Sequence, residues 1–506
     1  MLLFRQLTAV LVFLAAASLS CRPGSPAPSM QCTGIVCRLT KDAGLVLNQE
    51  TSDVIQATFR HASFPNIEGE QSILFLGSVS YIFKNLQIDN MSVEKSDVNF
   101  SDEKGILIDI RNVAANFRGT MNYAYSSWLL NLNHSLDFEI ESQTDLNLAL
   151  TLACDNGRIV VTVSDCLLNF DKLMLQIQSH NQTSWIQQLF TDFVSFTLRH
   201  TVKGQICTEI RKVANLLADF TLYQAALFIQ DGEIATSVEL TADPLITSRY
   251  IESWHEGSVS YKNSSVTQKP SAIPVERVET RMFNLWVSEP VINSLLFAAY
   301  KDDRLTLKLT DGDLKKLFGD RESEKQPNIL QQMIPGIPMH DLMMKLEPLR
   351  PPVILFKPLG TVMQASIAME VNVLSSSNNT DTALYLEMDS ETIVHASYAE
   401  RKICLRPSSN VWVIKVVRSN PVIALDQNEV EHYLEAFFSI GGLEKIISYV
   451  EFYITSLLDK KGLHYFNVTN SVMETNEGYV TIATDFSFPR QLLENFLQNL
   501  TPMARS

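Results

Sequence analysis

Apolar residues recur at two different periods along the chain, which separate sheet-forming from helix-forming stretches. Between residues 70 and 179 apolar and polar positions alternate, as in Ile106, Ile108 and Ile110. This is the period of strands that bury one face, because successive side chains point to opposite sides. The stretch therefore predicts a long antiparallel sheet.

Helical spacing precedes and follows this sheet. Residues 44–62 carry apolar side chains at helix-compatible positions and end before Pro65. Residues 184 to about 220 carry an apolar stripe, which includes Ile186, Phe190 and Ile206. We expect a first helix and then a long second one.

The same order returns in the second half. Ser288-Glu289-Pro290 begins a helix that runs to Tyr300, and alternating strands follow, including 305–309 and 363–373. A long helix covers 427–460 and is interrupted at Gly441-Gly442. Two rounds of helix, sheet and long helix indicate a duplication of shape without a residue-level repeat.

The two halves are separated by residues 263–280, which are polar, contain proline and show little periodicity. We interpret them as a linker. An alternating sheet must cover its apolar face, and one long helix per half can do so. The pattern thus predicts two helix-wrapped barrels in an elongated molecule.

The end of the chain, residues 488–500, has the pattern of a short amphipathic helix. Pro489 suits its start, Pro502 lies beyond its end, and its apolar face consists of Leu492, Leu493, Phe496, Leu497 and Leu500. Burying these side chains is worth roughly 7–15 kcal/mol. The face must cover protein core, lipid or a partner, and the pattern leaves these three open.

Composition places the protein outside the cell. Residues 2–20 form an apolar run ending in small residues, which predicts a signal peptide removed near Ser20. No other window has the about 18 apolar residues that a membrane span requires. Sequons for N-glycosylation occur at Asn90, Asn99, Asn133, Asn181, Asn263, Asn378 and Asn467, with a less credible one at Asn499 before Pro502.

Charge excludes one class of partner. The full sequence has 41 basic and 56 acidic residues, and loss of Arg5 with the signal peptide leaves 40 against 56, a net charge of −16. Such a chain is a poor binder of nucleic acid and is repelled by anionic lipid surfaces, although neutral lipid surfaces do not oppose it.

Motifs for catalysis and metal binding are missing from the sequence. It contains no Gly-x-Ser-x-Gly, no P-loop, no dinucleotide fingerprint and no Cys-x-x-Cys. Seven cysteines are too few for a disulfide scaffold, and their odd number leaves at least one unpaired. We therefore expect neither an enzyme nor a metal or other cofactor.

Two groups of residues remain as candidate binding residues. Trp128 and Trp185 suit positions that contact apolar groups on one side and water on the other, although they can equally be partly buried structural residues. Ser253 and His255 point to one face of a predicted strand. They form either a satisfied core pair or a polar anchor for an ester or a headgroup.

Four segments carry a specific resemblance to a known family: 43–51 (AGLVLNQET), 184–198 (SWIQQLFTDFVSFTL), 203–207 (KGQIC) and 250–255 (YIESWH). They resemble the bactericidal/permeability-increasing and lipid-transfer family over nearly the whole mature chain. The resemblance implies an α+β fold of two helix-wrapped antiparallel β-barrels joined by a central sheet. It further implies a boomerang shape and a lipid tunnel, with the C-terminal amphipathic helix and its face of Leu492, Leu493, Phe496, Leu497 and Leu500 as a lid at the tunnel mouth.

The resemblance also implies roles for individual residues. Cys166 and Cys207 match a disulfide that closes a loop worth roughly 4 kcal/mol. Ser253 and His255 match polar tunnel residues, and Leu222 and Gln224 replace the Gln and Arg expected at the tunnel neck. Trp128 and Trp185 match an aromatic tip that enters a lipoprotein surface, and Asn263 matches a glycosylated position.

Pattern and resemblance together divide the chain as follows: 1–20 signal peptide, 21–215 N-terminal barrel, 216–262 central-sheet segment, 263–280 linker, 281–461 C-terminal barrel, 462–487 return strands, and 488–506 amphipathic helix and tail. The pairing of Cys21, Cys32, Cys37, Cys154 and Cys404 stays open.

The function expected from this is a secreted plasma carrier, acting as a monomer without a transmembrane anchor. It exchanges cholesteryl esters, triglycerides and some phospholipid between HDL, LDL and VLDL particles, with bound lipid in place of a cofactor. A phospholipid transfer protein, an endotoxin-binding defence protein and a lipid-modifying enzyme are the alternatives. The negative net charge disfavours endotoxin, whose phosphates prefer basic surfaces.

Overall fold

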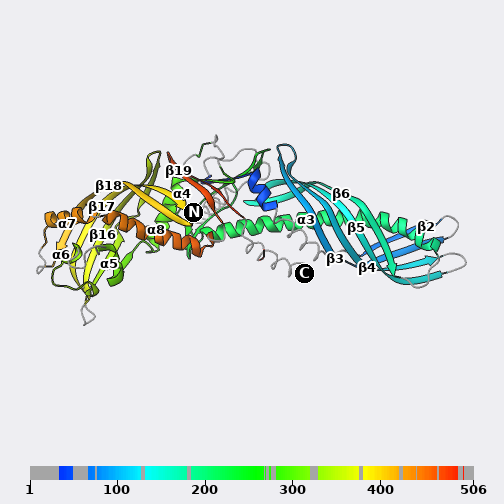
Figure 1. Ribbon diagram of the computed structural model, residues 1–506, viewed down its shortest axis with the longest axis horizontal. Coiled ribbons are helices and arrows are strands. Elements are labelled where there is room, and N and C mark those ends of the chain that lie inside the picture. Colours follow the sequence, from blue (N-terminus) through cyan, green and yellow to red (C-terminus); the bar gives the residue numbers. More distant parts are fainter. Residues whose placement is uncertain are drawn as a thin grey trace, which may run out of the picture.

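The structure, a computed structural model, is elongated and bent, with one half of the chain on each side of a central sheet (Figure 1). It describes residues 33–48, 66–73, 77–126, 131–178, 184–266, 268, 273–274, 281–318, 329–374, 380–420, 425–439, 441–463, 467–487 and 494. Among the helices in these ranges, none has the length and hydropathy of a membrane-spanning segment.

The N-terminal half is an antiparallel sheet in the strand order β2-β3-β4-β5-β6. Its strands are β2 (Ile67–Ile73), β3 (Gly77–Ser101), β4 (Gly105–Ser126), β5 (Asn131–Asp155) and β6 (Arg158–Gln178). The long helix α3 (Ser184–Ile229) packs against β6 and β7 (Ile234–Thr236). The alternating face of the sheet, including Ile110 and Phe117, forms one core cluster with Ile206 of the helix. The predicted sheet and its covering helix are thus confirmed.

The central sheet combines strands from both ends of the chain. Its order is β19 (Thr469–Asn476), β20 (Tyr479–Asp485), β12 (Phe283–Ser288), β1 (Ile35–Thr40), β9 (Tyr250–His255) and β8 (Leu245–Ile246). Beside it lies a smaller sheet of β11 (Ser264–Ser265), β10 (Val259–Tyr261) and β7.

The C-terminal half repeats the layout of the first. Its sheet has the order β13-β14-β16-β17-β18, with β15 paired to β16. The strands are β13 (Leu307–Thr310), β14 (Leu342–Pro348), β15 (Val353–Lys357), β16 (Gly360–Leu374), β17 (Thr380–Ala399) and β18 (Lys402–Ser419). The helices are α4 (Glu289–Lys301), α5 (Asp311–Phe318), α6 (Ile329–Met333), η1 (Met339–Asp341), α7 (Gln427–Ser439) and α8 (Gly442–Lys460).

Each half protects a long edge strand with side chains of its long helix. In α3, the Asn215 amide accepts a hydrogen bond from the Val161 N–H of β6 at 2.8 Å and donates one to its carbonyl at 2.9 Å. In α8, Glu451 and Thr455 accept bonds from the N–H groups of Leu405 and Ile403 of β18. Such contacts satisfy edge groups that would otherwise pair with another chain.

The two halves meet where α3 and α8 end. In Figure 1 the two helices approach each other near the middle of the molecule, and the Lys461 ammonium donates to the Gln230 carbonyl just beyond α3. Arg304, which follows α4, forms ion pairs with Asp231 and Asp302. Polar contacts thus join segments of the two halves at this junction.

Several predicted boundaries change. The long helix ends at Ile229 rather than near Phe220, because no glycine or proline interrupts the chain between Gly204 and Gly232. The interruption at Gly441 is confirmed, and its φ of 84° is one that glycine adopts readily. The expected helix at 44–62 is described only as far as residue 48, where residues 41–48 are helical.

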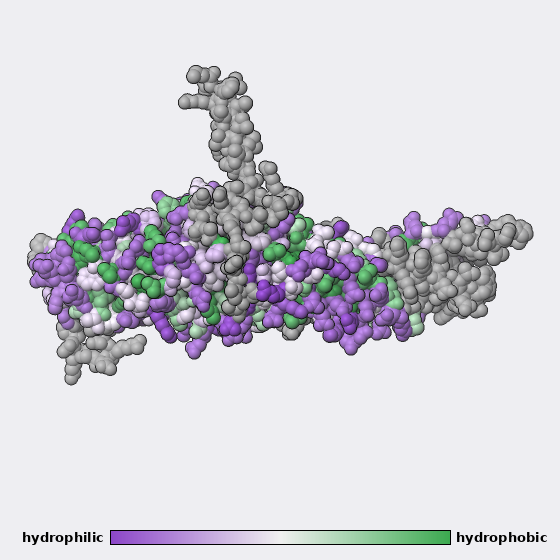
Figure 2. Space-filling view, turned by 90° about the horizontal axis from the view of Figure 1, so that it is seen from above, coloured by the Kyte–Doolittle hydropathy of each residue, from purple (hydrophilic) through white to green (hydrophobic). Residues whose placement is uncertain are grey.

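The expected linker is partly structured. Its residues Ser264–Ser265 pair with β10, and Ile273 is buried against Val36 and Trp286 of the central sheet. The fold class is confirmed as two helix-wrapped antiparallel sheets joined by a central sheet. On the face shown in Figure 2 hydrophilic residues predominate, with hydrophobic ones interspersed.

Candidate functional site

The strongest candidate site is a pair of polar side chains on β9. The Ser253 Oγ and the His255 Nε2 lie 2.8 Å apart, and His255 Nδ1 lies 2.7 Å from the Val238 carbonyl oxygen. Because a carbonyl only accepts, Nδ1 carries the proton and Nε2 accepts from the Ser253 hydroxyl. Both ring nitrogens are therefore used while the imidazole is neutral.

Burial keeps this imidazole neutral. His255 is 8% exposed, and desolvation lowers its pKa from 6.5, opposed by the hydrogen bond to Val238. A neutral Ser–His pair offers polarity without charge, which suits an apolar surrounding better than an ion does.

The pair belongs to an apolar face. Strand β1 runs antiparallel between β9 and β12, so that Ile35 lies opposite His255 and Cys37 lies opposite Ser253. Side chains two positions apart share a face, and Leu285 and Val287 of β12 extend it. Burial, and secondarily Glu252, raises the pKa of Cys37 to about 12, so its thiol stays protonated.

The opposite face of the same strands holds a buried ion pair that sequence reasoning missed. The Arg38 Nε and Nη2 donate to Glu252 Oε2 at 2.8 and 2.6 Å, and both side chains are 3% exposed. The guanidinium carbon lies 3.9 Å from the Tyr250 ring centre and 5.3 Å from that of Trp286. The signal available in the sequence was a lone charged residue, Arg38, in the strand IVCRLT.

Residues 237–241 contain the backbone carbonyl, that of Val238, which accepts the hydrogen bond from His255. Thr241 N–H donates to the Trp254 carbonyl and Gly257 N–H donates to the Ser237 carbonyl, which places Val238 beside the imidazole. Leu240 N–H donates to Gly157 in the β5–β6 turn. The acceptor that fixes the tautomer of His255 therefore lies between the central sheet and the N-terminal half.

The other expected tunnel residues lie on a different element. Leu222 and Gln224 are half-buried near the C-terminal end of α3, where Tyr223 and Leu227 are exposed. The ring nitrogens of His255 bond to Ser253 and Val238 and not to Gln224.

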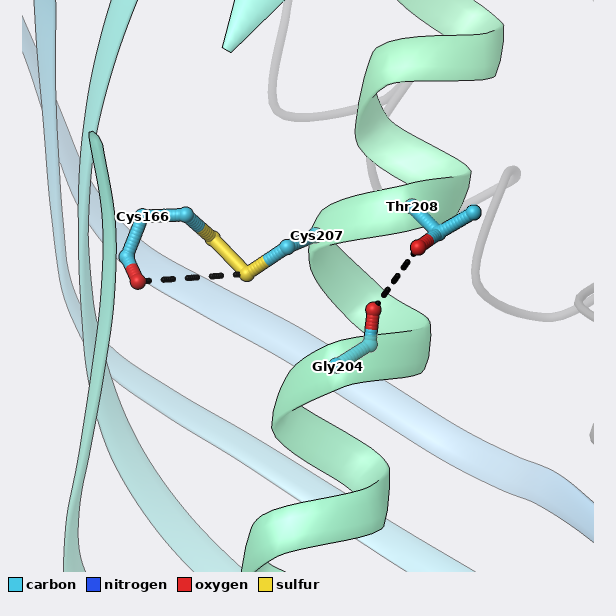
Figure 3. The surroundings of a disulfide bond; sticks show 4 residues. All are labelled: Cys166, Gly204, Cys207 and Thr208. Carbon is cyan, nitrogen blue, oxygen red and sulfur yellow. Dashed lines mark hydrogen bonds between the residues drawn. A yellow bond between two sulfur atoms is a disulfide. The ribbon is translucent and has the colours of Figure 1, made fainter. Parts of the chain in front are cut away.

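The disulfide implied by the family resemblance is confirmed. Cys166 of β6 and Cys207 of α3 are bonded, with their Cα atoms 6.1 Å apart, so the helix is tied covalently to the sheet (Figure 3). Among the other described cysteines, Cys154 is also disulfide-bonded, whereas Cys37 and Cys404 are free thiols.

Several predicted residues lie outside the described part. These are Trp128, the lid-helix residues Leu492, Leu493, Phe496, Leu497 and Leu500, and the sequons at Asn181, Asn378 and Asn499. Trp185 lies in the first turn of α3. Asn90, Asn99, Asn133, Asn263 and Asn467 are exposed, and glycosylation there stays a prediction. Within the described residues, no group of three or more His, Cys, Asp or Glu could hold a metal ion.

Comparison with known proteins gives matches over most of the chain. The pattern of the LBP / BPI / CETP family, N-terminal domain, matches residues 45–218, and that of the C-terminal domain matches residues 229–446. The cholesteryl ester transfer protein of Gallus gallus is 40% identical over 97% of both chains. That of Homo sapiens is 36% identical over 92% of this chain and 95% of its own.

Among solved structures, the crystal structure of lipopolysaccharide binding protein aligns over 90% of this chain and all of its own. Its TM-score is 0.48 at 16% sequence identity.

Proposed function

Since the chain belongs to the LBP / BPI / CETP family, we propose that it is a secreted lipid transfer protein that exchanges cholesteryl esters and triglycerides, with some phospholipid, between lipoprotein particles. It acts as a plasma monomer and moves lipids without making or breaking covalent bonds. An apolar passage lowers the barrier to transfer, because it replaces exposure of the lipid to water with apolar contact.

The observation that carries this proposal is the neutral Ser253–His255 pair on an apolar face. Cys37 on the same face keeps part of its surface accessible beside the buried side chains of Ile35 and Val287. Partly accessible surface on an apolar face is what a lipid passage would require. The Ser–His pair would then contact an ester group of a neutral lipid.

In the N-terminal half, a cavity of about 20 Å³ lies between the sheet and α3. Its wall includes Ile88, Phe117, Leu168 and Ile206. Ligand sites for small molecules usually measure about 300–1,000 Å³. We propose that lipid enlarges this space by moving α3 away from the sheet, with the helix held at one point by the Cys166–Cys207 bond.

Residues 488–500 are proposed as the lid of this passage, and Trp128 with Trp185 as the tip that enters a lipoprotein surface. Leu222 and Gln224 are proposed as lining at the passage neck. The division into signal peptide, two barrels, central-sheet segment, linker, return strands, and amphipathic helix with tail is proposed with the boundaries given above.

The lid has a direct test. Replacing Leu492, Phe496 and Leu500 with serine should reduce transfer of labelled cholesteryl ester between lipoproteins, whereas secretion and thermal unfolding stay unchanged. Replacing Gln491, Glu494 and Gln498 with alanine is the matched control on the polar face. If the first variant loses folding instead, the segment belongs to the core.

The cargo has an independent test. Mass spectrometry of lipids extracted from the purified secreted protein should find cholesteryl ester and triglyceride. Phospholipid alone would favour a phospholipid transfer protein. Tight lipopolysaccharide binding would favour a defence protein, which the net charge of −15 for the full sequence disfavours.

A further inference from the structure

Cys154 has a disulfide partner that the sequence did not predict. It is disulfide-bonded and 1% exposed. Cys166 and Cys207 bond to each other, and Cys37 and Cys404 are free thiols. Of the seven cysteines, only Cys21 and Cys32 remain, and both lie before the first described residue.

The described chain begins close to Cys154. Thr33 Oγ1 lies 2.8 Å from Thr241 Oγ1, and both residues are buried. The carbonyl of the preceding residue, Leu240, lies 3.9 Å from the Cys154 Sγ. The Cys154 N–H donates to Asp243 Oδ1 at 2.6 Å. Residues 240–243 therefore contact Thr33 on one side and Cys154 on the other.

The position of Thr33 discriminates between the two candidates. Adjacent Cα atoms are about 3.8 Å apart, and bonded cysteines place theirs about 4.4–6.8 Å apart. Cys32 immediately precedes Thr33. Thr33 is held by its own contact with Thr241 and by the next residue, Gly34, whose N–H donates to the His255 and Glu256 carbonyls. Cys21 would have to return across a Pro-, Gly- and Ser-rich stretch at an entropic cost.

We propose that Cys32 and Cys154 form a second disulfide, which joins the start of β1 to the β5–β6 turn. Two thiols lose two protons and two electrons when the S–S bond forms. The electrons reduce a disulfide of an oxidised dithiol–disulfide oxidoreductase in the secretory compartment to its dithiol.

The bond has a consequence for the candidate site. Leu240 pairs with His255 in a β-bridge, and Val238 supplies the carbonyl that accepts from the imidazole. A crosslink between Cys32 and Cys154 holds both chain segments that flank residues 237–241. The disulfide therefore positions the segment that orients His255.

Peptide mapping of the secreted full-length protein tests the proposal without any variant. Free thiols are alkylated, N-glycans are removed, and the unreduced chain is cleaved with cyanogen bromide and trypsin. Cleavage at Met30 separates Cys21 from Cys32. We expect the fragment 31–38, with Cys37 alkylated, to be linked to the fragment that contains Cys154. A link from Cys21 or Cys37, or an alkylated Cys154, overturns the proposal.

A mutant cycle gives a second measurement. Because one bond is broken in each case, Cys32→Ala, Cys154→Ala and the double variant should lower the midpoint of thermal unfolding equally. Cys404→Ala is the control and should leave the midpoint in place. A midpoint that falls for Cys154→Ala alone contradicts the pairing, and poor secretion of the variants leaves the peptide map decisive.

Discussion

At the scale of single residues, burial determines the protonation state of His255 in the candidate site. His255 donates to a backbone carbonyl and accepts from Ser253, which is the arrangement of a neutral imidazole. Its pKa is lowered mainly by desolvation. The sequence predicted that the two side chains share a face. It did not predict Val238, because that acceptor comes from a separate segment.

The lowered pKa of His255 predicts a pH dependence of stability. In the unfolded chain the imidazole titrates near 6.5, and in the folded protein it titrates below this value. Between the two pKa values the unfolded state binds more protons, so stability present above pH 6.5 is lost as the pH falls. Thermal unfolding followed from neutral to mildly acidic pH should therefore show a falling midpoint.

The contribution of this residue can be isolated. His255→Asn should flatten that slope, whereas the same change at the exposed His340 should not. Equal slopes in the wild type and in His255→Asn would contradict the assignment.

A second prediction concerns the ion pair on the opposite face. Arg38→Met removes the guanidinium that pairs with the buried Glu252 carboxylate and should cost roughly 3–5 kcal/mol in the free energy of unfolding. The double variant Arg38→Met/Glu252→Met should cost less than the sum of the single changes, as denaturant titration would show. Lys95→Met, which removes an exposed pair with Asp97, is the control and should have no measurable effect.

At the scale of elements, the long helices act as covers for edge strands. The apolar stripe of residues 184–220 predicted that a helix packs on the sheet, but not the strand on which it lies. Asn215, a polar residue that does not lie on that stripe, bonds both backbone groups of Val161. This choice depends on the edge that the folded sheet leaves unpaired.

Removing these hydrogen bonds should weaken the packing of α3 against β6. Asn215→Ala leaves the Val161 N–H and carbonyl without that side chain and should cost about 1–3 kcal/mol. Hydrogen exchange at the Val161 amide should become faster. Thr221→Ala is the control on the same helix, because its hydroxyl donates to the Leu217 carbonyl of α3 and, within the described part of the chain, to no residue of the sheet. Unchanged exchange at Val161 would show that other contacts hold α3 against β6.

At the scale of the whole molecule, the two halves are joined by the central sheet and by the polar junction at the ends of α3 and α8. Lys461 donates to the carbonyl of Gln230, where the carbonyls at a helix end carry partial negative charge. Arg304 pairs with Asp231 and Asp302, and its hydrogen bond is the main cause of the lowered pKa of Asp302.

Weakening the junction should widen the range of angles between the halves. The double variant Arg304→Met/Lys461→Met should broaden the interatomic distance distribution in small-angle X-ray scattering, with the midpoint of unfolding little changed. High salt should act on the wild type in the same direction, since these side chains are partly exposed. Lys345→Met, which removes a pair within β14, is the control. An unchanged distribution would assign the bend to the central sheet alone.

The sequence by itself determined the elements and their repeated order. Periodicity is local, so the alternation of β4 and β16, the break at Gly441 and the duplicated layout could be predicted from neighbouring residues. The four segments that carry the family resemblance added the disulfide between Cys166 and Cys207. The predicted end of α3 near Phe220 was wrong, because the apolar periodicity that indicated the helix is weak beyond that residue.

Only the tertiary structure decided which residues meet. Arg38 and Glu252 are 214 positions apart, and Thr33 and Thr241 are 208 apart, so no spacing along the chain signals either contact. Their meeting depends on the register in which β1 enters the central sheet between β9 and β12. That register is fixed by burial of one strand face against the rest of the fold, because a slip of one residue would exchange the apolar face with the face that carries the ion pair.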